Sequence, residues 1–570
     1  MTEGRVAGLV AGVVAGVIVT LGLLSLPGPE PAVAPAPARG GRFAWNQDSL
    51  WRSLESRYVR TRAAGCAAAG GDAAARVRSL TMTGDRLLRT PVAASAPALD
   101  SVERRFFALA PLIAACPRFL RAYVTLSGHL REAIKWQSRR WDVTTNDVRE
   151  RLYRTLYGFR GAVEEAMLQH PESIVPLLDG RHEPSATPAT VVHGVEIHSG
   201  DILVSRGGYP TSALIARGND YPGNFSHVGL VHIDTASRVA SVIEAHIERG
   251  VAVSTADEYL RDKKLRIMVL RLRTDLAPLV ADPMLPHRAA TRALERARSG
   301  RVKYDFDMDY TDPSRLFCSE VASSVYGELG VTLWTGLSTI SAPGLRRWLA
   351  AFGVRHFETQ EPSDLEYDPQ LVVVAEWRDA GALMKDHIDN AAIDAMLEGA
   401  ERGDALSYPW YRLPLARLAK AYSWLVGVVG GAAWAPCPRA CPRGRRCATV
   451  RSRTASAGSR PASRKPRRSG PGSRDTRPHT GCCSSWPAPR RTRAPPAHCG
   501  GPAPPRSFKA TPSVQELPRC PRATSASWKR WRRRTPPKPR RPNRTSGVNT
   551  TTRSNRSGKR TSSCATSSRR

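Results

Sequence analysis

Acidic residues are almost absent from one part of this sequence, and cysteine is scarce in the rest. From Ala435 to Arg570 the chain holds 35 Lys and Arg but only two acids, Asp475 and Glu516. The first 434 residues hold the other 50 basic and 48 acidic residues, so they are nearly neutral although the whole chain carries a formal charge of +35. The basic character belongs to the last quarter of the chain. This distribution excludes a protein that coats nucleic acid along its whole length.

Only three of the 11 cysteines, Cys66, Cys116 and Cys318, lie in the first 434 residues. Three cysteines cannot build a disulfide scaffold or a four-cysteine metal site. We expect neither a metal nor another cofactor. Cys66 and Cys116 either form a disulfide, if their segment folds outside the cytosol, or remain two buried thiols.

Large apolar side chains are also rare in residues 435–570, where one Leu, one Phe and three Val occur without any Ile. This content is far below what a folded core requires. The segment is either a polyanion-binding tail or a disordered or out-of-frame product. We favour a frameshift near codon 435, because the composition changes within the apolar segment Trp424 to Ala435. A nucleic-acid partner is not expected.

An uncharged apolar run of 20 residues, Ala7 to Leu26, stands near the amino terminus. About 20 apolar residues span a bilayer core of about 30 Å. We therefore expect residues 1–42 to be a transmembrane anchor followed by a Pro-rich tether, with the body on the periplasmic side of a bacterial inner membrane. Ala32-Val33-Ala34 resembles a signal-peptidase site, so a cleaved signal peptide and a secreted protein are the alternative.

Helical patterns occur on both sides of a β-rich segment. Residues 43–180 predict a helical domain, in which Thr144 to His170 places apolar residues three or four positions apart on one face. Residues 381–434 predict a helical extension that ends in an apolar segment.

Residues 188–380 alternate short apolar runs with turns. Val191 to Ile197, His227 to Ile233 and Val239 to His246 are typical of strands joined by tight turns. The sequence therefore predicts an α+β fold, with an antiparallel sheet that carries helices on one side and follows the helical domain.

Cys318 stands at the expected start of a helix. A helix amino terminus stabilises a thiolate, so we expect the pKa of this thiol to lie below that of free cysteine. A nucleophilic thiol also needs a base within hydrogen-bond reach. His227 begins a strand, and a turn centred near Ala236 would place Glu244 or Ala245 of the next strand opposite it. A carboxylate there would hold the imidazole tautomer, as the third member of a catalytic triad does.

Five short motifs occur in the order seen in one enzyme family. They are Gly200-Asp201-Ile202-Leu203-Val204, Ser226-His227-Val228-Gly229, Val242-Ile243-Glu244-Ala245 with Gly250-Val251, Tyr304-Asp305, and Phe317-Cys318-Ser319-Glu320. On these motifs, the stretch from about Val191 to Gly330 resembles the YiiX-like enzymes, which are permuted papain-like cysteine amidases of the NlpC-type superfamily.

The resemblance implies a permuted papain-like domain with Cys318 as nucleophile, His227 as base and Glu244 as the residue that orients the base. His246, on the same strand face as Glu244, is the rival for the third role. Tyr304 would line the site. The implied reaction is hydrolysis or acyl transfer at an amide or ester bond, with a cell-wall peptide or a lipid acyl group as substrate. A non-catalytic binding module on the same fold is the alternative.

Deleting Ala435 to Arg570 is expected to leave the melting temperature of the remaining protein unchanged, because the tail buries no apolar area. Thermal unfolding of the full and shortened chains in one buffer measures this. A large loss of stability would show that the tail packs against the body.

Overall fold

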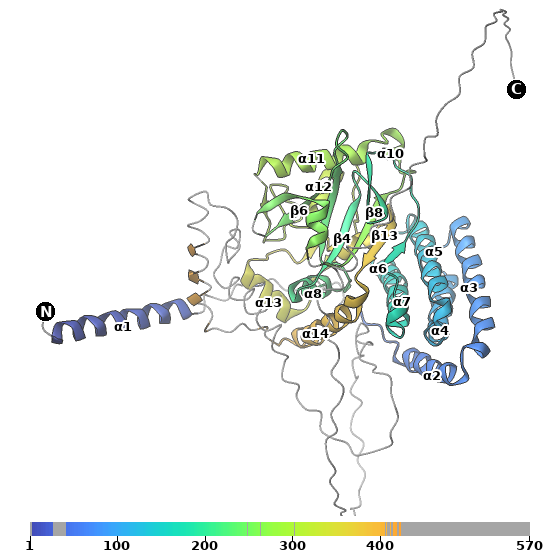
Figure 1. Ribbon diagram of the computed structural model, residues 1–570, viewed down its shortest axis with the longest axis horizontal. Coiled ribbons are helices and arrows are strands. Elements are labelled where there is room, and N and C mark those ends of the chain that lie inside the picture. Colours follow the sequence, from blue (N-terminus) through green and yellow to red (C-terminus); the bar gives the residue numbers. More distant parts are fainter. Residues whose placement is uncertain are drawn as a thin grey trace, which may run out of the picture. The chain divides into compact units, whose positions relative to one another are not determined.

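The computed structural model describes residues 3–26, 33, 41–247, 249–262, 264–300, 302–404 and a few positions between 406 and 422 (Figure 1). The apolar segment Trp424 to Ala435, the basic tail 435–570 and most of the Pro-rich tether lie outside these residues. What the sequence predicts for them stays a prediction.

Residues Glu3–Ser25 form helix α1. The prediction that Ala7 to Leu26 crosses a membrane is wrong, because no helix among the described residues is both long enough and apolar enough to do so. The apolar surface of this helix is interrupted by residues without a side chain, Gly8, Gly12, Gly16 and Gly22.

The helical segment contains six α-helices: α2 (Asp48–Ala64), α3 (Cys66–Arg89), α4 (Pro97–Ala115), α5 (Leu120–Ser138), α6 (Asn146–Leu152) and α7 (Gly158–Leu168). Thr144 to His170, expected as one helix, divides into α6 and α7 around a π-helical turn at Tyr153–Tyr157. Of the two alternatives for the cysteine pair, the disulfide is correct: Cys66 and Cys116 are bonded across the start of α3 and the end of α4.

A seven-stranded sheet forms the second part, with strand order β1-β13-β8-β4-β5-β6-β7. Every neighbouring pair is antiparallel. In chain order its strands are β1 (Leu177–Asp179), β4 (Ile202–Gly207), β5 (His227–Ile233), β6 (Ala240–His246), β7 (Gly250–Thr255), β8 (Lys264–Leu272) and β13 (Leu371–Arg378). The expected antiparallel sheet is therefore present, and the mixture of helices with this sheet agrees with the α+β class.

The remaining strands form two-stranded sheets: β2 (Ala189–Val192) with β3 (Val195–His198), β9 (Lys303–Tyr304) with β10 (Arg315–Leu316), and β11 (Ser338–Thr339) with β12 (Glu358–Thr359). Val191 to Ile197 is thus a hairpin rather than the single strand expected. The turn lies at His193 and Gly194, which both have positive φ, 47° and 82°. The apolar run hides this turn because only the glycine signals it.

The helices of the second part are α8 (Pro210–Arg217), α9 (Ala256–Arg261), α10 (Ala277–Ala281), α11 (Leu285–Ser299), α12 (Glu320–Gly327), α13 (Pro343–Phe352) and α14 (Leu383–Glu401). Helices α11 and α12 pack on β5 from one face of the sheet (Figure 1). The side chains on that face, such as Ile202 and Val228, belong to the same hydrophobic cluster as the helical segment. The opposite face, with Leu203 and Val231, is covered by the β2–β3 hairpin and α9.

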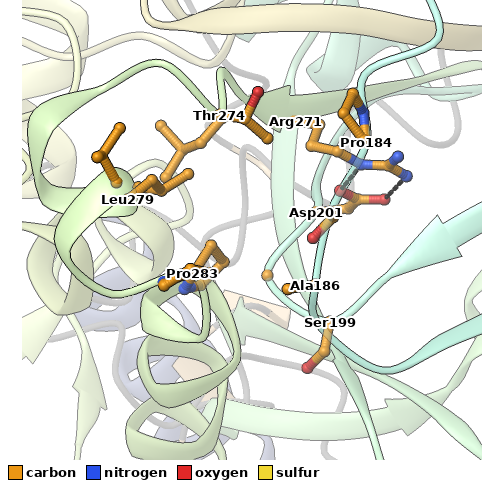
Figure 2. A pocket seen from close by; sticks show the side chains of 13 residues that line it. Pro184, Ala186, Ser199, Asp201, Arg271, Thr274, Leu279 and Pro283 are labelled. Atoms are coloured by element: carbon orange, nitrogen blue, oxygen red, sulfur yellow. Dashed lines mark hydrogen bonds and ion pairs between the residues drawn. The ribbon is translucent and has the colours of Figure 1, made fainter. Parts of the chain in front are cut away.

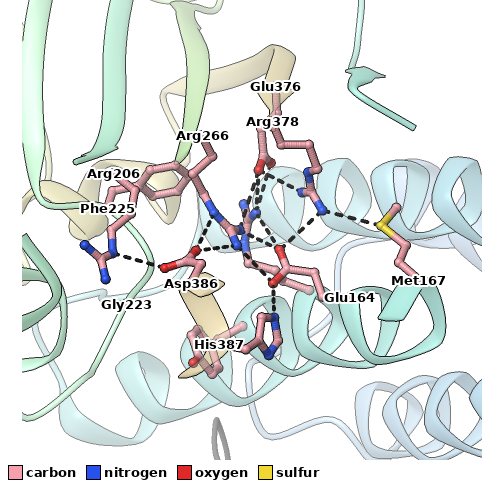
Figure 3. A network of polar contacts seen from close by, with 12 residues as sticks. Glu164, Met167, Arg206, Gly223, Phe225, Arg266, Glu376, Arg378, Asp386 and His387 are labelled. Atoms are coloured by element: carbon pink, nitrogen blue, oxygen red, sulfur yellow. Dashed lines mark hydrogen bonds and ion pairs between the residues drawn. The ribbon is translucent and has the colours of Figure 1, made fainter. Parts of the chain in front are cut away.

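Buried charges join the helical segment to the sheet (Figure 3). Glu164 of α7 accepts hydrogen bonds from Arg266 of β8, with Oε1 2.5 Å from Nη1, and pairs with His387 of α14. Arg266 also donates to Asp386 of α14, at 2.7 Å. Burial alone would raise the pKa of Glu164, but Arg266 and His387 outweigh it and hold that pKa well below its usual range. Glu164 is therefore a buried carboxylate whose charge is balanced by neighbouring elements.

The network extends from β8 to the neighbouring strand β13 through Arg160 of α7. This guanidinium lies 2.9 Å from Glu376 of β13 and also pairs with Glu366. Arg378 donates to the same Glu376 at 2.8 Å. The helical segment and the sheet are thus connected by ion pairs as well as by a shared apolar core.

Glu164→Ala is expected to reduce the free energy of unfolding by about 3–5 kcal/mol, because it leaves Arg266 buried without its main counter-charge. Asp72→Ala is the matched control: its pair with Arg76 is at the surface, and such pairs contribute about 0–1 kcal/mol. Urea denaturation of the two variants compares these losses. Equal losses would contradict the structural importance assigned to the network.

Candidate functional site

His227 is the first residue of β5 and directly follows the loop that leads into the strand. The backbone N–H of Ser226 donates to the carbonyl of Ser205 at 2.8 Å, and Ser205 is the β4 partner of His227. The His227 side chain is 22% exposed. Its Nε2 lies 2.7 Å from Oε2 of Glu244, so Nδ1 is the ring nitrogen left to exchange a proton with another group.

Glu244 reaches His227 from β6 along a diagonal of the sheet. Gly229 is the direct partner of Glu244, so the register differs by one or two residues from the one expected from a turn centred at Ala236. Because side chains alternate along a strand, His227 and Gly229 lie on the same face, and the diagonal neighbour is still within reach of a long side chain. The glycine itself is required by Val242, whose Cγ1 would lie 2.6 Å from a Cβ at position 229.

The Glu244 carboxylate is buried and has three polar neighbours. Besides His227, Ser254 Oγ donates to Oε1 at 2.9 Å, and His246 Nε2 lies 3.2 Å from Oε1. Burial would raise the pKa of Glu244, but hydrogen bonding to His227 and His246 and their charges hold it well below its usual range. Glu244 is therefore ionised at neutral pH and can stabilise a positive charge on His227.

His246 contacts the carboxylate rather than the other histidine. The ring centroids of His227 and His246 are 6.3 Å apart, which is too far for a direct hydrogen bond between the two rings. Of the two candidates for the orienting residue, the structure thus places Glu244, and not His246, in hydrogen-bond contact with His227.

Cys318 lies between β10 and α12, two residues before the helix begins at Glu320 and thus close to the helix start that the sequence predicts. Its side chain is reduced and buried, with 8% exposure. Hydrogen bonds reach the sulfur from the backbone N–H groups of Val228 and Ser319. Val228 follows His227 directly, so the main chain of β5 passes the sulfur, but the side chains of His227 and Cys318 make no hydrogen bond with each other.

The expectation of a low thiol pKa is wrong for the resting structure. Burial raises the pKa of Cys318 to about 12, and the negative charge of Glu361 acts in the same direction. Glu361 is itself buried, and its own pKa is raised to about 8 by burial and by Asp364. Hydrogen bonds at the start of α12 favour the thiolate, but they do not outweigh removal from water.

Burial also sets the protonation state of the histidine. It lowers the pKa of His227, while the hydrogen bond and charge of Glu244 act against this shift. At neutral pH both the thiol and the imidazole are therefore uncharged. The pair differs from a preformed thiolate–imidazolium pair, and the thiol must lose its proton to become a nucleophile.

Tyr304 lies next to the cysteine segment, because it pairs with Leu316 in the parallel β9–β10 ladder. Burial raises the pKa of Tyr304 well above its usual range, and a negative charge on Cys318 would act in the same direction. Its ring makes an edge contact with Phe306, with centroids 5.1 Å apart. Tyr304 is therefore a neutral phenol beside the segment that carries Cys318, and its role in lining the site stays a prediction.

Sequence patterns did not reveal several other residues of this region. Glu361 is more than 40 positions from Cys318 and follows no recognisable motif. Ser254 and Tyr259 come from β7 and α9; the Tyr259 hydroxyl donates to Ser205 Oγ at 2.9 Å beneath the site. Only Ser319, as the neighbour of Cys318 in its motif, carried a sequence signal.

A cavity of about 290 Å³ lies at the other end of β4 (Figure 2). None of Cys318, His227 and Glu244 lines it. Its wall contains the ion pair in which Arg271 Nε and Nη2 each lie 2.8 Å from an oxygen of Asp201. The first motif, Gly200-Asp201, is thus structural, since Asp201 is neutralised there. Within the described part of the chain, no group of three or more His, Cys, Asp or Glu side chains could hold a metal ion.

Residues 196–375 match a family described as permuted papain-like amidase enzymes, YaeF/YiiX, C92 family. The resemblance noted in the sequence is thereby confirmed over about a third of the chain. The matched family consists of amidases, which supports hydrolysis of amide bonds by the segment that contains Cys318, His227 and Glu244.

A solved structure with similarity to the chain is the crystal structure of the metalloprotein yiiX from Escherichia coli O157:H7, DUF1105. It is 19% identical, and the alignment covers 32% of this chain and 98% of that one, with a TM-score of 0.26. At that TM-score the likeness supports no structural argument. No curated protein matches the chain.

Glu244→Gln is expected to lower the pKa of His227 further, because the carboxylate is the group that raises it. NMR titration of the imidazole signals measures this shift. His246→Ala is the control: the charge of His246 lowers the pKa of His227, so removing it is expected to raise that pKa. If His246→Ala lowered the pKa more than Glu244→Gln did, His246 would be the orienting residue.

Proposed function

Since residues 196–375 match a family of permuted papain-like amidases, we propose that this protein is a cysteine-dependent hydrolase or acyl transferase acting on amide or ester bonds. Cys318 is the nucleophile, His227 the base, and Glu244 the residue that orients and charges the base. The observation that supports these roles best is the 2.7 Å contact between His227 and Glu244, on the strand whose Val228 N–H bonds the sulfur of Cys318.

The reaction begins from a neutral pair. His227 Nδ1 takes the proton of the Cys318 thiol as the sulfur attacks the carbonyl carbon, and Glu244 stabilises the imidazolium that results. The tetrahedral intermediate then collapses: the bond to the leaving amine or alcohol breaks, and His227 returns the proton to it. Water, or another acceptor in a transferase, resolves the acyl-thioester with His227 again acting as base.

The substrate proposed first is a cell-wall peptide. The support is indirect: the Cys66–Cys116 disulfide suits an oxidising compartment outside the cytosol, where amide bonds of cell-wall peptides are available. A lipid acyl group is the second substrate class, because the same thiol chemistry cleaves acyl esters. Tyr304, a neutral phenol near the sulfur, would contact either substrate.

A non-catalytic binding module is the alternative function. The buried Cys318, whose pKa is raised to about 12, favours it, because a binding module needs no accessible thiolate. An enzyme on this site must lose that proton during the reaction rather than before it, which the His227–Glu244 pair allows.

Cys318→Ala is expected to abolish turnover, by about a thousandfold or more, with little change in stability. His227→Ala is expected to cost nearly as much, and Glu244→Gln less, because the amide keeps a hydrogen-bonding oxygen but loses the charge. Release of amine from cell-wall peptides and release of fatty acid from acyl esters are the measurements, with mass spectrometry of the acylated protein as a second readout.

The Ser254→Ala variant is the matched control, since the Ser254 hydroxyl donates to Glu244 and bonds neither His227 nor Cys318. Its loss of activity should be smaller than that of Glu244→Gln. Full activity in Cys318→Ala would exclude a cysteine-dependent enzyme. If the unaltered protein and Cys318→Ala bound cell-wall peptides equally strongly and neither turned them over, the protein would be a binding module.

A further inference from the structure

Ser319 occupies the N-cap position of α12 but does not cap it. A serine at this position ordinarily accepts a hydrogen bond from the backbone N–H two or three residues later. The Ser319 side chain makes no such bond. Instead, Glu320 serves the turn before the helix, where its Oε2 accepts the N–H of Phe317 at 2.8 Å. The hydroxyl of Ser319 is therefore available for another purpose.

The Ser319 side chain is completely buried. Its hydroxyl makes no hydrogen bond of regular geometry with any described residue. The polar neighbour of this hydroxyl is the sulfur of Cys318, and the interaction between them lowers the pKa of the thiol. A buried hydroxyl without a full partner costs stability, and this one lies beside the sulfur, which points to a functional use.

The surroundings of the sulfur otherwise disfavour a negative charge. Burial and the charge of Glu361 raise the thiol pKa, and a negative charge on Cys318 would in turn raise the pKa values of Tyr304 and Tyr259. Few hydrogen-bond donors favour the thiolate: they are the backbone N–H groups of Val228 and Ser319, and the Ser319 hydroxyl. Among these donors only the hydroxyl can turn toward the sulfur without moving the main chain.

We propose that the Ser319 hydroxyl is a positioning donor held in reserve beside Cys318, which completes its hydrogen bond when the sulfur becomes a thiolate. This inference rests on the proposed cysteine chemistry. As the thiol proton passes to His227 Nδ1, the hydroxyl rotates and donates to the negative sulfur. When the sulfur forms the neutral thioester the bond weakens, and the hydroxyl returns to its resting orientation.

The test is alkylation of Cys318 by iodoacetamide in the full-length protein, between about pH 8 and 10. In this range, below the thiol pKa, the rate follows the thiolate fraction. Mass spectrometry of the peptide that contains Cys318 separates it from the other cysteines. Losing one hydrogen bond to the thiolate is expected to raise the pKa by about one unit, and allowing for the higher nucleophilicity of a more basic sulfur, Ser319→Ala should react about three- to tenfold more slowly.

Ser323→Ala is the matched control, because Ser323 is a buried serine on the same helix whose hydroxyl bonds Gln360 rather than Cys318. Its alkylation rate should equal that of the unaltered protein. Ser319→Thr keeps the hydroxyl and should restore most of the rate. Ser319→Ala should also melt at the same temperature or higher, since it removes a hydroxyl that lacks a regular partner.

An unchanged alkylation rate in Ser319→Ala would overturn the proposal. A lower melting temperature with unchanged alkylation would overturn it as well, by assigning Ser319 a structural role. Alkylation needs no turnover, so its result is independent of the hydrolase assignment. A protein in which Cys318→Ala keeps its activity would refute the proposed function while leaving the effect of Ser319 on the thiol measurable.

Discussion

Removing ionisable groups from water is the constraint on which this structure depends. A buried charge is costly unless a partner balances it. Glu164 meets this requirement with Arg266 and His387, and its pKa falls. Glu244 meets it with two histidines and a serine. Cys318 does not meet it: burial raises the pKa of its thiol, and the charge of Glu361 adds to the effect. Whether a buried group is charged thus follows from its neighbours rather than from its type.

The same constraint decides how the candidate site can work. A permanently ionised Glu244 beside a neutral His227 favours proton uptake by the imidazole, because the positive charge formed is stabilised at once. A neutral thiol in turn stays unreactive until a carbonyl group is close enough to accept the sulfur. Under the proposed mechanism, burial therefore limits the chemistry of Cys318 to the moment at which substrate has displaced water from the site. This gives protection against oxidation at the expense of a ready nucleophile.

The sequence predicted those features that depend on local pattern. Strand alternation located β5 and β6, and of the three residues that the motif order named, His227, Glu244 and Cys318, the structure brings His227 and Glu244 into contact. The predicted register of β5 and β6 was wrong by one or two residues, because the turn that sets it has no strong glycine signal. His227 and Glu244 are nevertheless in contact, because a glutamate can reach a diagonal neighbour on the next strand. The prediction for the thiol pKa failed for a different reason: burial raises that pKa most, and Glu361, which comes from a distant loop and lies in no pattern, adds to the effect. Burial of the sulfur and the charges that the fold brings near it are thus what the local sequence pattern could not predict.

The buried ion pairs extend beyond the segment that matches the family, and this shows which parts of the chain fold together. The matched segment, residues 196–375, contains Arg266 but none of its three carboxylate partners, Glu164, Glu376 and Asp386. Cut out alone, that segment would bury a guanidinium without a counter-charge, or else open its sheet edge to water. The helices on both sides, α7 and α14, therefore supply charges that the sheet requires. They are parts of the folded unit that carries the site, rather than additions to a domain that is complete without them.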